Sequence, residues 1–267
     1  MKYAFMSFST PALKLGETLA VAARYGYEGI EPRLDADHAH GIEVATSAED
    51  REEICAIAAD SPVELCCLAT SLTYADPAKT TEMIEGSHAR IDLAGDLGVP
   101  TLRVFGGKMG EGLEREAAID LVADSLGQVA DHAGEREVVL CMETHDDWCD
   151  PAHVAAVMER VSHPAVAVNW DIMHPVRSAG KSMDEAFEAL NPWIRHLHIH
   201  DGTTGGKLTF AAIGTGGIDH RRALELLLPT GYDGYLSGEW IGWEPHDLHL
   251  PREVQVMRGY EEELGQA

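Results

Sequence analysis

The sequence predicts an α/β fold, a single-domain (β/α)8 TIM barrel spanning residues 1–267. Eight short apolar runs of the kind found in buried parallel strands alternate with stretches that carry helical periodicity or helix-capping residues. A length of 267 residues suits one α/β barrel. No linker-like or low-complexity segment interrupts the alternation. A doubly wound open sheet is the alternative that the same pattern allows.

The expected elements follow one another from the N-terminus. Apolar and β-branched residues predict strands at residues 3–8, 29–31, 63–69, 101–105, 138–143, 165–171, 194–200 and 232–240. Helices are expected at residues 14–24, 47–60, 80–97, 113–133, from 150, and at 182–190, 219–228 and 252–264. Gly26 and Gly98 follow the first and third helices, as residues that end helices do. Ser47, Asp150 and Asp219 are suitable N-caps.

Composition excludes several classes of function. A net charge of −25 argues against a nucleic-acid partner, because such binding needs a basic surface. No run of about 18 apolar residues predicts a membrane span, and the first residues lack a signal-peptide pattern. The five cysteines are odd in number, and Cys66 and Cys67 are adjacent within an apolar run. They are expected to be free thiols in a reducing compartment, which predicts a cytoplasmic protein.

The seventh expected strand carries three alternating histidines, His196, His198 and His200. Because strand side chains alternate between faces, all three point the same way. Three imidazoles on one buried face each need a partner, so the pattern indicates a metal ion or a substrate.

Acids end the neighbouring strands. The fifth ends at Glu143, the sixth at Asp171 and the eighth at Glu239, while the seventh supplies either His198 or His200. Since active sites of such barrels lie at the carboxyl ends of the strands, these groups are expected to converge. Each acid alone would be a helix cap or a solvated loop residue; four in register favour a divalent ion such as Mn²⁺, Co²⁺, Mg²⁺ or Fe²⁺. The absence of thiolates argues against structural zinc.

The remaining histidines carry weaker signals. His145 and His174 follow the fifth and sixth strands, as substrate contacts or as surface residues. His196 is expected deep in the barrel. The histidines outside the strand ends are expected at the surface: His38, His40, His88, His132, His153, His163, His220, His246 and His249.

An ordered set of motifs carries a family resemblance. The motifs are Gly29-Ile30-Glu31, Leu102-Arg103-Val104-Phe105-Gly106, Met142-Glu143-Thr144-His145, Asp171-Ile172-Met173-His174, His198-Ile199-His200-Asp201, Ile213-Gly214-Thr215-Gly216-Gly217-Ile218-Asp219 and Gly238-Glu239. Together they resemble the xylose isomerase-like TIM barrel superfamily, in the branch of sugar-phosphate isomerases and epimerases and family 2 apurinic endonucleases. The nuclease members add metal-binding histidines at the third and fourth strand ends, where this sequence has Leu68-Ala69-Thr70 and Val104-Phe105-Gly106.

The resemblance assigns roles to the strand-end residues. The seventh strand of the family usually ends His-x-Lys-Asp with the first histidine as metal ligand, which implies His198 here. The acid ligands correspond to Glu143, Asp171 and Glu239, and the resemblance implies His174 as a substrate contact. His200 stands at the usual lysine position and is a departure from the family pattern.

The resemblance implies a divalent-metal-dependent isomerase or epimerase, with one ion, Mn²⁺ first. Its substrate would be a small carbohydrate-like molecule: a keto-sugar, a polyol-derived or another hydroxy-carbonyl compound. Glu143 and Glu239 would exchange the α-proton through a metal-stabilised enediolate. His145, His174 and His200 would bind the substrate, with Lys207 and Arg103 near an anionic group.

Rival functions remain open at this point. The same residues would serve a dehydratase acting on an inosose or a dehydroshikimate-like compound. A non-catalytic sugar-binding barrel and a DNA-repair endonuclease are less favoured. Trp240 and Trp243 are expected to be exposed, as a pocket wall or as the interface of a homo-oligomer.

Overall fold

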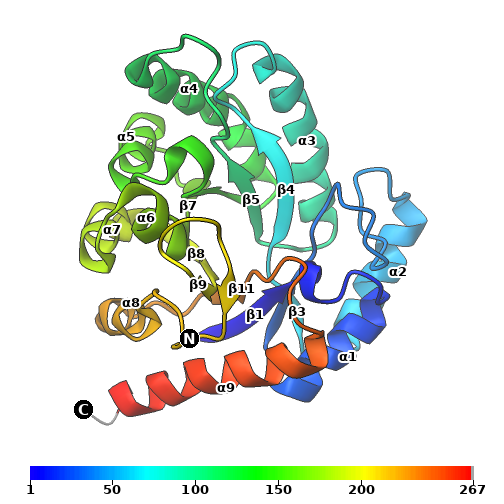
Figure 1. The fold of residues 1–267 in the computed structure, drawn as a ribbon. Coiled ribbons are helices and arrows are strands. Elements are labelled where there is room, and N and C mark those ends of the chain that lie inside the picture. The colour runs from blue at the N-terminus through cyan, green and yellow to red at the C-terminus, as the bar shows by residue number, and fades with distance from the viewer. Residues whose placement is uncertain (266–267) are drawn as a thin grey trace.

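The computed structural model describes residues 1–265 and confirms the barrel. Helices surround a nearly closed ring of parallel strands (Figure 1). The strands are β1 (Lys2–Met6), β2 (Gly29–Glu31), β3 (Glu64–Leu65), β4 (Leu68–Thr73), β5 (Thr101–Phe105), β6 (Val139–Glu143), β7 (Val166–Asp171), β8 (Ile194–Ile199), β9 (Asp201–Gly202), β10 (Phe210–Ala211) and β11 (Tyr235–Gly238). The main sheet has the order β3-β2-β1-β11-β8-β7-β6-β5-β4.

The ring closes through the third predicted strand. That stretch forms two segments, β3 and β4, which lie at opposite ends of the sheet order and are separated by Cys66 and Cys67. β3 pairs with β2, and β4 pairs with β5. The N–H of Leu34, just after β2, donates to the carbonyl oxygen of Ala69 in β4 at 2.8 Å. The strand therefore changes partners within a few residues, which brings the two sheet ends together.

The helices cover the outside of the ring (Figure 1). They are α1 (Leu15–Tyr25), α2 (Ala48–Ala59), α3 (Thr80–Asp96), α4 (Arg115–Glu135), α5 (Pro151–Val161), α6 (Met173–Ala179), α7 (Met183–Leu190), α8 (His220–Leu227) and α9 (His246–Gly265). The predicted caps form: Ser47, Asp150 and Asp219 each accept a backbone N–H, and Gly26 ends α1 with a φ of 82°. Within residues 1–265, no helix combines the length and apolar character that crossing a membrane would need.

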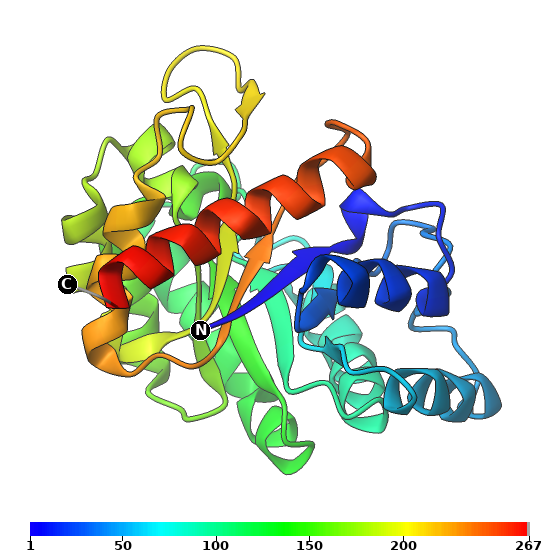
Figure 2. The same cartoon turned by 90° about the horizontal axis from the view of Figure 1, so that it is seen from below.

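Three features differ from the sequence prediction. α9 begins at His246 and not at residue 252. α6 was not predicted, since it has only about two turns, directly follows β7 and contains Pro175. The short antiparallel pair β9 and β10 was also missed, and Figure 2 shows this segment (yellow) standing clear of the barrel. All three features lie beside the carboxyl ends of the strands.

Several residues expected at the surface are buried. His40, His220 and His249 are at most 5% exposed, because each finds a partner inside. His220 Nδ1 lies 2.9 Å from the carbonyl oxygen of Ile218, and His249 Nε2 lies 3.0 Å from Ser9 Oγ. Trp240 is 1% exposed and packs against the His249 ring, so the expectation of an exposed indole there was wrong.

Gly238 provides a test of barrel packing. A Cβ added at Gly238 would overlap the Trp240 indole. We expect Gly238→Ala to lower the free energy of unfolding by about 1–3 kcal/mol, as overpacked buried positions do. Gly127→Ala is the control, since nothing lies within 4 Å of the added Cβ in α4 and the change should stabilise the helix by about 0.5–1 kcal/mol. Chemical denaturation measures both, and equal effects would contradict the packing argument.

Candidate functional site

Four neighbouring strands bring Glu143, Asp171, His198 and Glu239 together. β6, β7, β8 and β11 are adjacent in the sheet, and their carboxyl ends form one side of the barrel mouth. Asp171 of β7 lies opposite His198 of β8, and His198 lies opposite Ser237, two residues before Glu239. The parallel pairing of the strands thus places the four side chains at a similar height along the barrel axis, at its carboxyl end.

The four groups form a compact cluster. One atom from each side chain lies within 4.8 Å of all the others, and all four residues are buried. His198 Nδ1 is 3.2 Å from Glu143 Oε1 and 3.6 Å from Glu239 Oε2. Three carboxylates and one imidazole make a donor set suited to Mg²⁺, Mn²⁺ or a similar divalent cation.

The electrostatics keep the carboxylates of Glu143 and Asp171 charged. Burial raises the pKa of Glu143, but His198 and Arg103 outweigh it and bring the pKa down to about 2. Burial likewise raises the pKa of Asp171, and attraction to His174 and His200 lowers it well below its usual range. Asp171 Oδ2 is buried and forms an ion pair with His200 Nε2 at 2.8 Å. Three buried carboxylates clustered around one imidazole fit a cation site.

Asp171 also explains the unpredicted helix. Its Oδ1 accepts the N–H of Met173 at 2.8 Å and of His174 at 2.9 Å, which are the first residues of α6. One oxygen of the carboxylate therefore holds the helix, while the other lies 2.8 Å from His200 Nε2. The capping role and the candidate ligand role belong to the same side chain.

Glu31 is a buried site residue that the sequence reasoning missed. It ends β2, and its carboxylate is 2.9 Å from His196 Nε2 and 3.1 Å from His198 Nε2. His196 accordingly lies inside the barrel and bonds a neighbour, as expected. The available signal was an acid ending an apolar strand, the same signal that marked Glu143 and Asp171.

The predicted substrate-binding histidines form a row beside the cluster. The ring centroids of His145 and His174 are 4.5 Å apart, and those of His174 and His200 are 5.6 Å apart. Phe105 extends the row beyond His145, and Phe210 extends it beyond His200. His200 Nδ1 is 3.1 Å from the carbonyl oxygen of Glu239, so this ring also touches the segment that carries the acid.

The two predicted cationic residues are placed differently. The buried guanidinium of Arg103 lies with Nε 3.2 Å from Glu143 Oε2, donates to the carbonyl oxygen of Thr70 at 2.8 Å and stacks on the Phe105 ring. It thus holds Glu143 from the side away from His198. Lys207 is exposed between β9 and β10 and is not brought into the cluster.

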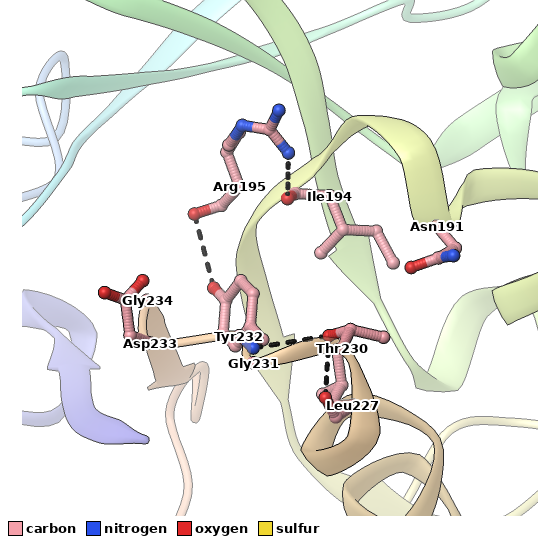
Figure 3. A pocket seen from close by; sticks show the side chains of 9 residues that line it. All are labelled: Asn191, Ile194, Arg195, Leu227, Thr230, Gly231, Tyr232, Asp233 and Gly234. Atoms are coloured by element: carbon pink, nitrogen blue, oxygen red, sulfur yellow. Dashed lines mark hydrogen bonds between the residues drawn. The ribbon is translucent and has the colours of Figure 1, made fainter.

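A separate cavity lies at the opposite end of the barrel. It has a volume of about 340 Å³ and is bordered by the start of β8, the end of α8 and the segment before β11 (Figure 3). Its polar groups bond to the backbone: Arg195 donates to the carbonyl oxygen of Ile194, and Thr230 donates to that of Leu227. None of the clustered acids or histidines borders this cavity.

Comparison with known proteins identifies the family. The profile of the family described as Xylose isomerase-like TIM barrel matches residues 19–260. The chain belongs to this family. The match covers every clustered residue of the barrel mouth.

Relatives of this xylose isomerase-like barrel are enzymes. The 3-dehydroshikimate dehydratase of Bacillus anthracis is 22% identical over 277 aligned residues, covering 96% of each chain. The solved structure of an L-ribulose 3-epimerase superposes with a TM-score of 0.81 at 18% identity, covering 99% of this chain and 96% of that one. A xylose isomerase-like TIM barrel protein from Mycobacterium smegmatis in complex with magnesium gives a TM-score of 0.76 at 19% identity, covering 98% and 97%. At these identities the structures show a shared fold.

His145 of this xylose isomerase-like barrel is expected to stay protonated at neutral pH. Burial lowers its pKa, but Asp146 at 3.2 Å, Glu143 and Glu239 outweigh burial and raise the pKa to about 9. Because the folded value exceeds the unfolded value of about 6.5, the stabilisation is complete below pH 6.5 and is lost as pH rises through 9. NMR titration of the metal-free protein should give a midpoint above 8, and Asp146→Asn should lower it. A wild-type midpoint below 7 would contradict the charge arrangement.

Proposed function

We propose that this protein is a divalent-metal-dependent isomerase or epimerase that moves a proton on a small hydroxy-carbonyl substrate. The observation that carries the proposal is the pairing of two strand-end glutamates, Glu143 and Glu239, within 4.8 Å of each other and of Asp171 and His198. The preferred substrates are keto-sugars and polyol-derived ketones.

Glu143 and Glu239 would move the proton. They come from β6 and from the end of β11, with β7 and β8 between them, so they would approach the substrate from the two ends of this row of strands. Glu143 is a carboxylate at neutral pH and is able to accept the α-proton. Arg103 fixes the orientation of Glu143. Glu239, protonated from solvent, would deliver its proton to the opposite face in an epimerisation or to the neighbouring carbon in an isomerisation. Glu143 would then release the abstracted proton to solvent, which restores both acids for the next turnover.

Glu143, Asp171, His198 and Glu239 would hold the cation, with Mn²⁺ as our first assignment. When bound, a divalent ion would act as a Lewis acid for the negative charge that develops on the substrate oxygens. His145, His174 and His200 would contact the substrate, because their rings form a row beside the cluster. Five free cysteines among the described residues support the proposal of a cytoplasmic enzyme.

A dehydratase is the second candidate. The Bacillus anthracis relative that aligns over 96% of both chains is a 3-dehydroshikimate dehydratase. The first step would be the same abstraction of an α-proton, after which a β-hydroxyl leaves as water. A histidine such as His145, with its raised pKa, is suited to protonate the departing hydroxyl.

A substrate screen tests the proposal. Protein loaded with Mn²⁺ is incubated in D₂O with keto-sugars, inososes, hydroxypyruvate and 3-dehydroshikimate. NMR then reports deuterium at the α-carbon, epimerised or isomerised products, and unsaturated products of water loss. We expect metal-dependent deuterium incorporation with at least one class. Water loss would select the dehydratase, and no exchange with any compound would contradict both candidates.

A further inference from the structure

Glu31 lies beside the candidate ligand His198 and is shared by two histidines. Its side chain is fully buried at the end of β2. Oε2 is 2.9 Å from His196 Nε2, while Oε1 and Oε2 are 3.1 and 3.2 Å from His198 Nε2. The Glu31 carboxylate therefore contacts two imidazole rings, those of His196 and His198, which lie two residues apart on the same face of β8.

The two nitrogens of His198 face different surroundings. Nε2 faces only Glu31, whereas Nδ1 faces Glu143 Oε1 at 3.2 Å and Glu239 Oε2 at 3.6 Å. A carboxylate accepts hydrogen bonds and does not donate them, so without a cation both ring nitrogens donate, Nδ1 to Glu143 and Nε2 to Glu31. When a cation takes the place of the Nδ1 hydrogen, the hydrogen that Glu31 holds on Nε2 is the one that remains. In the neutral ring the lone pair then lies on Nδ1, the atom that faces the other candidate ligands.

We infer that Glu31 is a positioning residue that selects the metal-binding tautomer of His198. This inference rests on the proposed cation site. Glu31 holds the Nε2–H of His198, and it fixes the ring plane so that Nδ1 is directed at the cation. Its negative charge at that distance also makes the imidazole a stronger donor. Glu31 touches neither substrate nor cation.

His196 supports Glu31 from the other side. Its Nε2 donates to Oε2, which satisfies a carboxylate that has no access to water. Burial raises the pKa of Glu31, and the two histidines outweigh burial and lower it well below the usual range. In this arrangement His198 would bind the cation, Glu31 bonds His198, and His196 bonds Glu31.

Glu31→Gln tests the inference through binding of Mn²⁺. Glutamine keeps the shape and offers one acceptor oxygen, but its amide group competes for the same position and its charge is gone. We expect the dissociation constant for Mn²⁺ to rise about 10–100-fold with one ion still bound per chain. Glu31→Asp keeps the negative charge but moves it away from His198, because the side chain is one methylene shorter. It should raise the dissociation constant for Mn²⁺ by less than Glu31→Gln does. Glu253→Gln is the control, since Glu253 is equally buried but bonds Ile213 N–H away from the cluster.

A measurement on the unaltered protein covers the case in which the Glu31 variants do not fold. In ¹⁵N NMR of the Zn²⁺-loaded protein, His198 should show a protonated Nε2 and a metal-bound Nδ1. The reverse assignment would overturn the inference, as would a Glu31→Gln protein that binds Mn²⁺ with unchanged affinity. Two ions in the wild type and one in Glu31→Gln would make Glu31 a ligand instead. Failure of the wild type to bind Mn²⁺ would count against the proposed function itself.

Discussion

Glu143→Gln is expected to abolish exchange of the substrate α-proton with solvent, lowering the rate by about 10²–10⁴-fold. Glutamine retains the volume of the side chain but cannot accept a proton. Because Glu143 is also a candidate ligand, the variant is compared at saturating Mn²⁺, where its metal content equals that of the wild type. Deuterium incorporation followed by NMR measures the rate.

Glu239→Gln separates the two acids. If Glu143 removes the proton and Glu239 returns one, the Glu239→Gln protein should still incorporate solvent deuterium at the α-carbon of the substrate, while the rate of product formation falls. Glu253→Gln, a buried glutamate outside the mouth, should leave both rates unchanged. Wild-type exchange rates in both Glu143→Gln and Glu239→Gln would remove proton transfer by these acids from the mechanism.

His198→Ala is expected to lose the bound metal ion, whereas His200→Ala keeps it. Removing His198 deletes one of the four clustered donors. The dissociation constant should rise more than about 100-fold, since loss of a mere outer-sphere partner costs 10–100-fold. His200 contacts the carbonyl oxygen of Glu239 through Nδ1 and Asp171 through Nε2. Its loss should therefore weaken metal binding by no more than the roughly 10–100-fold of an outer-sphere partner and leave the ion bound.

Elemental analysis of the purified proteins after dialysis compares the two variants. Equal metal content in His198→Ala and wild type would remove His198 from the ligand set. Loss of metal from His200→Ala alone would place the ion in the neighbouring group formed by Asp171, His174 and His200, whose ligand atoms also lie within 4.8 Å of one another.

The barrel and its central cluster were predictable because both depend on local periodicity. Alternating βα units determine which strands neighbour one another, and the carboxyl ends of parallel strands share one edge. Glu143, Asp171 and Glu239 each stand at the end of a predicted strand, so their positions in the sequence are enough to place them at this edge. The choice of His198 over His200 needed the family resemblance, since period two places both on the same face.

The missed features depend on contacts across the barrel. Glu31 contacts His198, which lies 167 residues later in the sequence. A local sequence pattern marks Glu31 as a strand-end acid but does not predict which residue it contacts across the barrel. The buried His220 and His249 have the same polarity as surface histidines, and only their backbone and hydroxyl partners distinguish them. α6 begins where one carboxylate oxygen of Asp171 accepts the first backbone N–H groups of the helix. In the sequence, an aspartate at this position is interpreted either as a helix cap or as a metal ligand, and here the same side chain is suited to both roles.

The divided carboxylate of Asp171 has a consequence for motion. Because Oδ1 anchors the first turn of α6 and Oδ2 belongs to the same candidate ligand, a restraint on one oxygen restrains the other. The two effects are reciprocal by thermodynamic linkage: an occupied mouth makes opening of the helix less favourable, and a loosened helix weakens retention of the ion by the same free energy. The amides of Met173 and His174 are thus natural reporters of occupancy, readable by hydrogen exchange without any substrate.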